Sequence, residues 1–285
     1  MVYLDLCVKK KSRLHLNYDT LSYISGGNRT CSMKNLLTWV IMIPLIIVMS
    51  CKESPKSGDA PISSEAESVA NQIDNSLTEA EKADGWVLLF DGQNIDQWHK
   101  YNADTLNKNW VIDDNAIHFN PDNEDDGDIT SNESYNDFEL KIDWKVQECG
   151  NSGIMFNVQE GAEYKTPWLT GPEMQVLDNE CHPDAKIRMH RAGDLYDLIE
   201  CSEVTVNPGG EWNSIKIVSK DAKYEFWQNG VKVVSFEMHT PEWLAIVADS
   251  KFKDMPDFGK FKEGKIVLQD HRDRVWFKNI KIKTL

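Results

Sequence analysis

The sequence is poor in cysteine and has no long helical periodicity, and both absences restrict the fold. It contains six cysteines in 285 residues, and the three that follow residue 51 lack the paired spacing of a zinc site. Apolar residues do not recur every three to four positions over several turns, and only residues 182–199 have room for a turn or two of helix. Helices and strands therefore do not alternate, which argues against a parallel α/β fold.

The three late cysteines, Cys149, Cys181 and Cys201, cannot all be bridged within one chain because their number is odd. Buried free thiols are the default expectation. One disulfide stays open as an alternative, because the exported compartment inferred below is oxidising.

Positive charge is also scarce. The chain has 31 Lys and Arg against 46 Asp and Glu, a formal net charge of −15. Residues 1–51 contain six basic and two acidic side chains, so the remainder carries −19. Such a surface argues against nucleic acid or an anionic membrane surface as a partner and suits an extracytoplasmic domain that handles neutral ligands.

The first eighty or so residues are typical of export and tethering. Lys34 precedes the apolar run LLTWVIMIPLIIVMS and Cys51, and the sequence VMSC resembles a bacterial lipobox. We therefore expect residues 33–51 to be a lipoprotein signal peptide, with Cys51 lipidated in the cell envelope, in the periplasm or at the outer membrane. An ordinary secretory signal with a chance cysteine is the alternative. Residues 1–32 have no readable pattern and are consistent with a mis-set start codon, and residues 52–83 have the composition of a flexible tether.

Residues 84–285 predict one all-β domain. In the segment 137–146, DFELKIDWKV, apolar and polar residues alternate strictly, as in a strand with one buried face. Further strands are expected in EWNSIKIVS, GKIVLQD and VWFKNIKIK. In YEFWQNGVKVVSF the pair Asn229-Gly230 predicts a two-residue hairpin turn. Many antiparallel strands without helices between them predict a β-sandwich of two antiparallel sheets.

The ten tryptophans are expected mainly in the core. Trp98, Trp168 and Trp243 lie beside turn residues, and each is a candidate platform for a sugar ring.

Several motifs resemble a known family. GWVLLFDGQNIDQWH, WVIDDNAIHF, GNSGIMFNV, GPEMQVLDN, HRAGDLYDLI and FWQNGVKV follow in the order found in the 3-keto-disaccharide hydrolase, or 3-keto-glycoside lyase/hydratase, domain. The resemblance covers residues 84–285. It implies a concanavalin A-like jelly-roll sandwich and a substrate already oxidised at C3 of the sugar.

The segment GPEMQVLDN also resembles the E-x-D-x-x-E strand of laminarinase-type enzymes, but reads Glu173-x-Gln175-x-x-Asp178. Glutamine cannot titrate, so the ordinary mechanism with two carboxyl groups is in doubt. Asp178 would reach the cleft only through a bulge, because positions five apart in a strand face opposite ways. The structural alternative is that Asp178 caps the turn at Asp178-Asn179 by accepting a hydrogen bond from a backbone N–H group.

A 3-ketone acidifies the hydrogen on C2, so a base can form an enolate that expels the group at C1, and water can add back. This route needs a base that titrates near neutral pH, a partner for the enolate oxygen and an acid for the leaving group. The candidate catalytic residues are His190 as base, Glu173 as alternative base, Arg191 as donor to the enolate and Tyr196 as donor to the leaving oxygen. The candidate substrate-binding residues are Asn151, Gln175, Trp168 and His271. A divalent metal ion is possible, with Glu173, the alternative base, as one ligand and Asp178 and His182 as further ligands.

Each candidate has a plainer alternative. His190 could simply be solvated, and Arg191 could pair with Asp194 or Glu200. The acidic run 122–128 is expected to be a solvated loop rather than a weak calcium site. At the level of the whole domain, the alternatives are a non-catalytic carbohydrate-binding lipoprotein and a conventional glycosidase.

Overall fold

The computed structural model describes residues 73–122 and 125–285. The predicted signal peptide, Cys51 and most of the predicted tether lie outside the described residues. None of the helices in the described part has the length and apolar character needed to cross a membrane.

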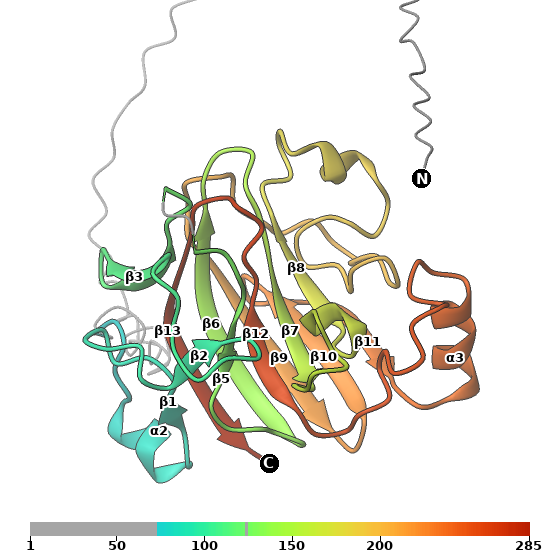
Figure 1. The fold of residues 1–285 in the computed structure, drawn as a ribbon, viewed down its shortest axis with the longest axis horizontal. Coiled ribbons are helices and arrows are strands. Elements are labelled where there is room, and N and C mark those ends of the chain that lie inside the picture. Colours follow the sequence, from blue (N-terminus) through green and yellow to red (C-terminus); the bar gives the residue numbers. More distant parts are fainter. Residues whose placement is uncertain (1–72, 123–124) are drawn as a thin grey trace, which may run out of the picture. The chain divides into compact units, whose positions relative to one another are not determined.

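Thirteen strands in the described residues form two antiparallel sheets (Figure 1). The larger sheet contains β1 (Val87–Leu88), β3 (Trp110–Asp113), β4 (Ala116–Phe119), β6 (Phe138–Val146), β9 (Asn213–Lys220), β10 (Lys223–Gln228), β11 (Val231–Glu237) and β13 (Val275–Thr284). The smaller sheet contains β2 (Trp98–Lys100), β5 (Ile129–Ser131), β7 (Asn151–Val158), β8 (Glu173–Leu177) and β12 (Lys265–Leu268). The strand orders are β11-β10-β9-β6-β13-β4-β3, with β1 beside β13, and β2-β5-β12-β7-β8.

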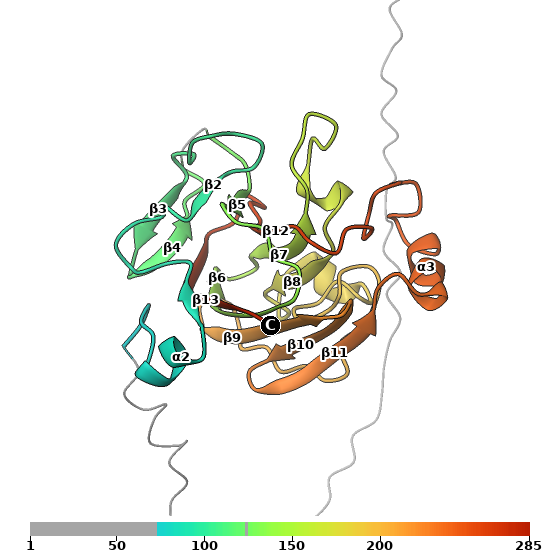
Figure 2. The same cartoon turned by 90° about the horizontal axis from the view of Figure 1, so that it is seen from below.

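The two sheets stack on each other, which confirms the predicted all-β sandwich (Figure 2). One contiguous apolar cluster fills the space between them. Phe156 of the smaller sheet packs against Tyr224 and Phe226 of the larger, with ring centroids 5.1 and 5.8 Å apart. Burial of such aromatic side chains stabilises the fold by about 1.5–3 kcal/mol each.

The predicted strands and hairpin are confirmed. In β6 every second residue is buried, and the residues between are half-buried. Asn229 and Gly230 connect β10 to β11 with φ angles of 48° and 82°. Both values are positive, as a type I′ turn requires.

Residues 73–83 pack against the larger sheet, although their composition predicted a tether. The helix α2 (Glu79–Ala83) begins at a capping box: the Thr78 hydroxyl accepts from the Glu81 N–H, and the Glu81 carboxylate accepts from the Thr78 N–H. Glu81 also pairs with Lys281, and Asp74 lies 2.7 Å from Lys278 Nζ. These residues therefore belong to the folded unit.

The helix α3 (Pro241–Ala248) was not predicted and lies beside β11 (Figures 1 and 2). Its N-cap Thr240 accepts a hydrogen bond from the Trp243 N–H. The Trp243 ring stacks between Phe236 and Phe258, with centroids 5.6 and 6.3 Å away. This packing joins α3 to β11 and to Phe258 in the loop that follows α3. The helical turn expected within 182–199 is present as the short 3₁₀ helix η2 (Pro183–Lys186), and a second one, η1 (Pro167–Leu169), precedes β8.

Cys149 and Cys181 form a disulfide, and Cys201 is a buried free thiol. The default expectation of free thiols is therefore wrong for the first two, and the alternative of one disulfide is confirmed. The bridge closes a loop of 32 residues, for which the chain-entropy model gives a stabilisation of roughly 3–4 kcal/mol. It ties the turn between β6 and β7 to the segment after β8.

Candidate active site

A cavity of about 300 Å³ lies on the face of the smaller sheet that points away from the core. Two strands of this sheet, β7 and β8, and loops that follow other elements contribute the wall. The lining residues are Asn151, Trp168, Glu173, Gln175, Tyr196, Lys251, Phe252, Met255, Gln269 and His271.

Strand β8 supplies the two central polar side chains. Met174 and Val176 point into the core, so Glu173 and Gln175 face the cavity. The pairing of β8 with β7 runs without a register shift from Met155↔Glu173 to Asn151↔Leu177. The bulge that would have returned Asp178 to the cavity is therefore absent from this pair of strands.

Gly153 of β7 makes room for the Glu173 side chain. Ideal geometry would put a Cβ at residue 153 only 1.9 Å from Glu173 Oε1 and 2.6 Å from its carboxyl carbon. The Glu173 carboxyl thus lies across the neighbouring strand at a distance that only glycine permits. The motif GNSG is explained in part by this contact.

Burial controls the ionisation of Glu173. The residue is 7% exposed, and no described residue donates a hydrogen bond to its carboxyl group. Desolvation raises its pKa from the ordinary 4.5 to about 8. The Lys251 ammonium opposes this rise, and the negative charge of Asp128 adds to it.

Tyr196 and Lys251 also line the cavity. The Tyr196 N–H donates to the Glu173 carbonyl at 3.0 Å, and an adjacent bridge joins Leu195 to Met174, so this segment extends the edge of β8. Burial, then the Glu173 charge, raises the pKa of the Tyr196 hydroxyl, which therefore stays protonated. Lys251 Nζ lies 3.7 Å from the centroid of the Tyr196 ring, and desolvation lowers its pKa.

The remaining predicted substrate-binding residues also meet at this cavity. Asn151 is buried, and its Oδ1 has no hydrogen-bond partner among the described residues. An unpaired buried amide oxygen is costly, and a ligand hydroxyl could satisfy it. Trp168 keeps 39% of its surface exposed, and His271 lies on the loop after β12.

Two of the four candidate catalytic residues, His190 and Arg191, do not line the cavity. His190 lies behind Tyr196, with ring centroids 4.4 Å apart, and its Nε2 lies 2.9 Å from Asp197 Oδ1. Arg191 Nη2 donates to Glu200 Oε1 at 2.8 Å, which is one of the ion pairs considered as an alternative. The arrangement makes His190 a support for Tyr196 and turns Arg191 away from the cavity.

The sequence profile of the 3-keto-alpha-glucoside-1,2-lyase-like domain family matches residues 85–283. The chain belongs to this family. The resemblance noted in the sequence is therefore confirmed.

Relatives agree with this assignment. A 3-keto-disaccharide hydrolase from Bacteroides thetaiotaomicron is 34% identical over 274 residues, which cover 84% of this chain and 94% of the relative. A solved structure from Parabacteroides distasonis, whose description as a glycosyl hydrolase is provisional, is 37% identical with a TM-score of 0.69. That match covers 75% of this chain and 100% of the solved one. A second structure from the same organism, 23% identical with a TM-score of 0.55, covers 70% of this chain and 99% of its own length, and it shares the fold.

In this 3-keto-glucoside lyase-like domain, the predicted metal ligands Asp178 and His182 both accept hydrogen bonds from backbone N–H groups. Asp178 accepts from the N–H groups of Cys149 and Glu180 at 2.8 and 3.0 Å, so it caps a turn. His182 Nδ1 accepts from the Asp184 N–H at 3.2 Å and caps η2. The one group of three possible ligands in the described part consists of Glu148 and the two sulfurs of the disulfide. These residues do not fit a metal site.

Among the described residues of the acidic run 122–128, three carboxylates are partly or largely exposed, as expected for a solvated loop, and form ion pairs at the surface. Lys100 pairs with Asp125 at 2.9 Å, while Arg272 and Arg274 pair with Asp126 and Asp122. Asp128 is buried, and desolvation raises its pKa to about 7.

Sequence reasoning missed four lining residues, Lys251, Phe252, Met255 and Gln269. The first three lie on the loop after α3, where no local periodicity marks a site. Gln269 directly follows β12, where alternation along GKIVLQD offered a signal. The platform prediction is wrong for Trp98 and Trp243, which are 3% and 2% exposed core residues.

Proposed function

We propose that this chain cleaves 3-keto-glycosides by removing the C2 proton, expelling the C1 substituent and adding water. The observation that carries the proposal is that Glu173 is the one carboxyl group among the residues that line the cavity. Glycosidases that hydrolyse unoxidised sugars generally need two carboxyl groups, about 5–5.5 Å apart in the retaining class. Proton abstraction next to a ketone needs one base.

Glu173 is the base in this proposal, in place of His190. A general base is most effective when its pKa lies near the working pH, and burial brings the pKa of Glu173 to about 8. Negative charge then develops on the oxygen at C3. The Lys251 ammonium shares the cavity with Glu173, so it can stabilise this enolate.

Tyr196 supplies the proton for the leaving oxygen at C1, because its hydroxyl stays protonated beside Glu173. The amides of Asn151, Gln175 and Gln269 bind sugar hydroxyls, and the Trp168 ring stacks on a sugar face. His271 contacts the substrate at the outer edge.

The test compares a 3-keto-glucoside with the parent glucoside, each with and without a chelator, and identifies the products by mass spectrometry. We expect cleavage of the keto substrate alone. A product lighter by one water would identify elimination before hydration, and loss of activity with chelator would add a metal requirement. Cleavage of the parent glucoside would instead indicate a conventional hydrolase. Binding without cleavage of either compound would indicate a lectin.

We also propose that the protein is a lipoprotein of the cell envelope, because the apolar run before Cys51 ends in a lipobox-like sequence. Metabolic labelling with a palmitate analogue should mark the wild type and not Cys51→Ser. Equal labelling of both would contradict the anchor.

A further inference from the structure

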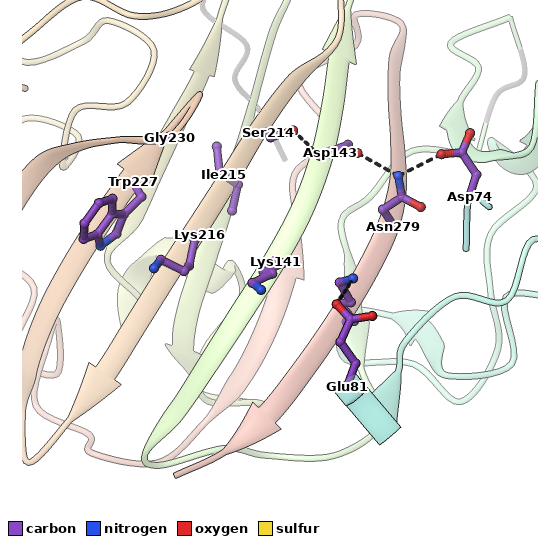
Figure 3. A pocket seen from close by; sticks show the side chains of 11 residues that line it. Asp74, Glu81, Lys141, Asp143, Ser214, Ile215, Lys216, Trp227, Gly230 and Asn279 are labelled. Atoms are coloured by element: carbon purple, nitrogen blue, oxygen red, sulfur yellow. Dashed lines mark hydrogen bonds and ion pairs between the residues drawn. The ribbon is translucent and has the colours of Figure 1, made fainter. Parts of the chain in front are cut away.

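A second, larger cavity of about 430 Å³ lies on the face of the larger sheet that points away from the core. Its floor comes from β6, β9, β10 and β13, and residues of the N-terminal segment form one wall (Figure 3). The lining residues are Asp74, Glu81, Lys141, Asp143, Ser214, Ile215, Lys216, Trp227, Gly230, Asn279 and Lys281. We name it the outer pocket. The core of the sandwich separates it from the cavity that contains Glu173.

Lysines lie side by side across the floor of the outer pocket. The strand registers pair Trp227 with Lys216, Lys216 with Lys141, and Lys141 with Lys281. Figure 3 shows Trp227, Lys216 and Lys141 in a row on neighbouring strands. On the far side of Trp227, its other neighbour is Lys232. Like charges directly opposite each other in an antiparallel pair are destabilising.

Among the described residues, no carboxylate lies within hydrogen-bond distance of the two central lysines, Lys141 and Lys216. Lys281 pairs with Glu81, and Lys232 pairs with Glu225 at 3.0 Å. Lys141 Nζ forms a long ion pair with the Glu139 carboxylate at 3.9 Å and lies over the Trp86 ring at 4.4 Å, and Lys216 Nζ lies over the Trp227 ring at 4.2 Å. Desolvation, reinforced by Lys281 and Lys216, lowers the pKa of Lys141. Two neighbouring ammonium groups are thus available to a ligand.

The other end of the outer pocket is rich in acceptors. Asp143 accepts from the Ser214 hydroxyl at 2.5 Å and from the Asn279 amide at 2.7 Å, and the same amide donates to Asp74 at 3.0 Å (Figure 3). No lysine hydrogen-bonds to the Asp143 carboxylate within the described chain. Carboxylates held in this way accept hydrogen bonds from sugar hydroxyls.

We propose that the outer pocket binds an acidic sugar residue of a glycan, with its anionic group on Lys141 and Lys216 and its hydroxyls on Asp143 and Asp74. Neighbouring strands lie about 4.8 Å apart, so two lysines on them can both reach one carboxylate or sulfate. The Trp227 ring borders the apolar side of the sugar. A neutral sugar would leave both ammonium groups unpaired, and a simple anion would leave the acceptor end unused.

The test is calorimetric titration of the purified protein with an oligogalacturonide, a sulfated galactose oligosaccharide of the same length and the neutral galactose oligosaccharide. We expect binding of one or both acidic probes, weakening as salt rises, and none of the neutral probe. Lys141→Ala and Lys216→Ala should each weaken binding about tenfold or more, because each loses a charged hydrogen bond. Lys220→Ala removes the same charge from the exposed end of β9 and should change binding less than twofold.

Three outcomes would overturn the proposal: no binding of either acidic probe, equal binding of the neutral probe, or equal weakening by Lys220→Ala. The variants should keep wild-type activity on a 3-keto-glucoside, because the catalytic cavity lies on the other sheet. The proposal therefore stands or falls independently of the proposed catalytic function.

Discussion

The two outer faces of the sandwich differ in the sign and the burial of their charged side chains. On the smaller sheet, one carboxyl group is buried over a glycine and surrounded by amides, aromatic rings and a single nearby ammonium group. On the larger sheet, lysines lie in a row. The outer two, Lys281 and Lys232, pair with carboxylates, and Lys216 lies over the Trp227 ring.

The comparison shows two different environments for a charged side chain: burial away from water, which shifts its pKa, and a position near other charged groups on a sheet surface. Desolvation moves the pKa of Glu173 to about 8, close to the value that its proposed role as a base requires. Lys141 and Lys216 of the outer pocket are only half-buried, so their ammonium groups can donate to a ligand. We infer that the outer face of the smaller sheet, where a carboxyl group is buried, carries out catalysis. The outer face of the larger sheet, where ammonium groups are accessible, binds a ligand.

The largest expected effect comes from removing the buried acid. Glu173→Gln should lower turnover of a 3-keto-glucoside by about 10²–10⁴, because the variant has no base. His190→Ala is the matched comparison, and we expect a smaller loss because His190 does not line the cavity. Steady-state kinetics would decide between them, and a larger loss in His190→Ala would return the role of base to the histidine.

Stability should change in the opposite direction to activity in Glu173→Gln. Because burial raises the pKa of this acid above 4.5, the wild type loses stability as pH rises from about 4.5 to 8, where only the unfolded chain ionises readily. The variant lacks this loss. Its melting temperature relative to the wild type should therefore increase between pH 4.5 and 8, and a constant difference would show that Glu173 is not buried as an acid.

A smaller but still large effect is expected at Gly153. In Gly153→Ala the new methyl group would lie within 2 Å of the present position of Glu173 Oε1, so the carboxyl must move and turnover should fall about 10²-fold. Combining it with Glu173→Gln provides the control. If Gly153 acts through Glu173, the double variant should be no slower than Glu173→Gln alone.

The pH profile provides a finer test of the same face. The value of kcat/KM should rise with pH and level off above about 8, where Glu173 is ionised. Lys251 lowers the pKa of Glu173, so Lys251→Met should move the rising limb to higher pH. Lys253→Met, which removes an exposed charge from the same loop, should leave it in place. If the rising limb of the kcat/KM profile stays at the same pH in Lys251→Met, the Lys251 ammonium does not influence the ionisation of Glu173.

The smallest effect is expected on the larger sheet. Lys216→Thr removes repulsion against Lys141 but also the contact of a cation with Trp227, which is worth about 0.5–1 kcal/mol. The two changes oppose each other, so the free energy of unfolding should stay within about 0.5 kcal/mol of the wild type. Chemical denaturation would measure it. A decrease of more than about 1 kcal/mol in the free energy of unfolding would show that Lys216 stabilises the fold.

The fold could be predicted because its signals are local. Strict alternation marked β6, and Asn229-Gly230 marked the hairpin, without reference to the rest of the chain. The helix α3 also carried a local signal, since Thr240 and Pro241 are an N-cap and a first-turn proline, but its length of eight residues gave little periodicity.

The site was predictable only where it lies on strands. Glu173 and Gln175 follow from the alternation of β8. The direction of His190 depends on Asp197, and Lys251 reaches Glu173 from a loop 78 positions further along the chain. Such contacts depend on the tertiary packing of irregular segments, which no pattern in the sequence records.

The docking of residues 73–83 has a mechanical consequence. In a chain held upstream of Ile73, a force on the domain first acts on the contacts of this segment with β13. These include the ion pairs of Asp74 with Lys278 and of Glu81 with Lys281, and the hydrogen bonds between Asn75 and Asn279. Strand β13 lies inside the larger sheet, between β6 and β4. The load is therefore spread over the interior of that sheet, and the strands that carry Glu173 and its neighbours bear none of it directly.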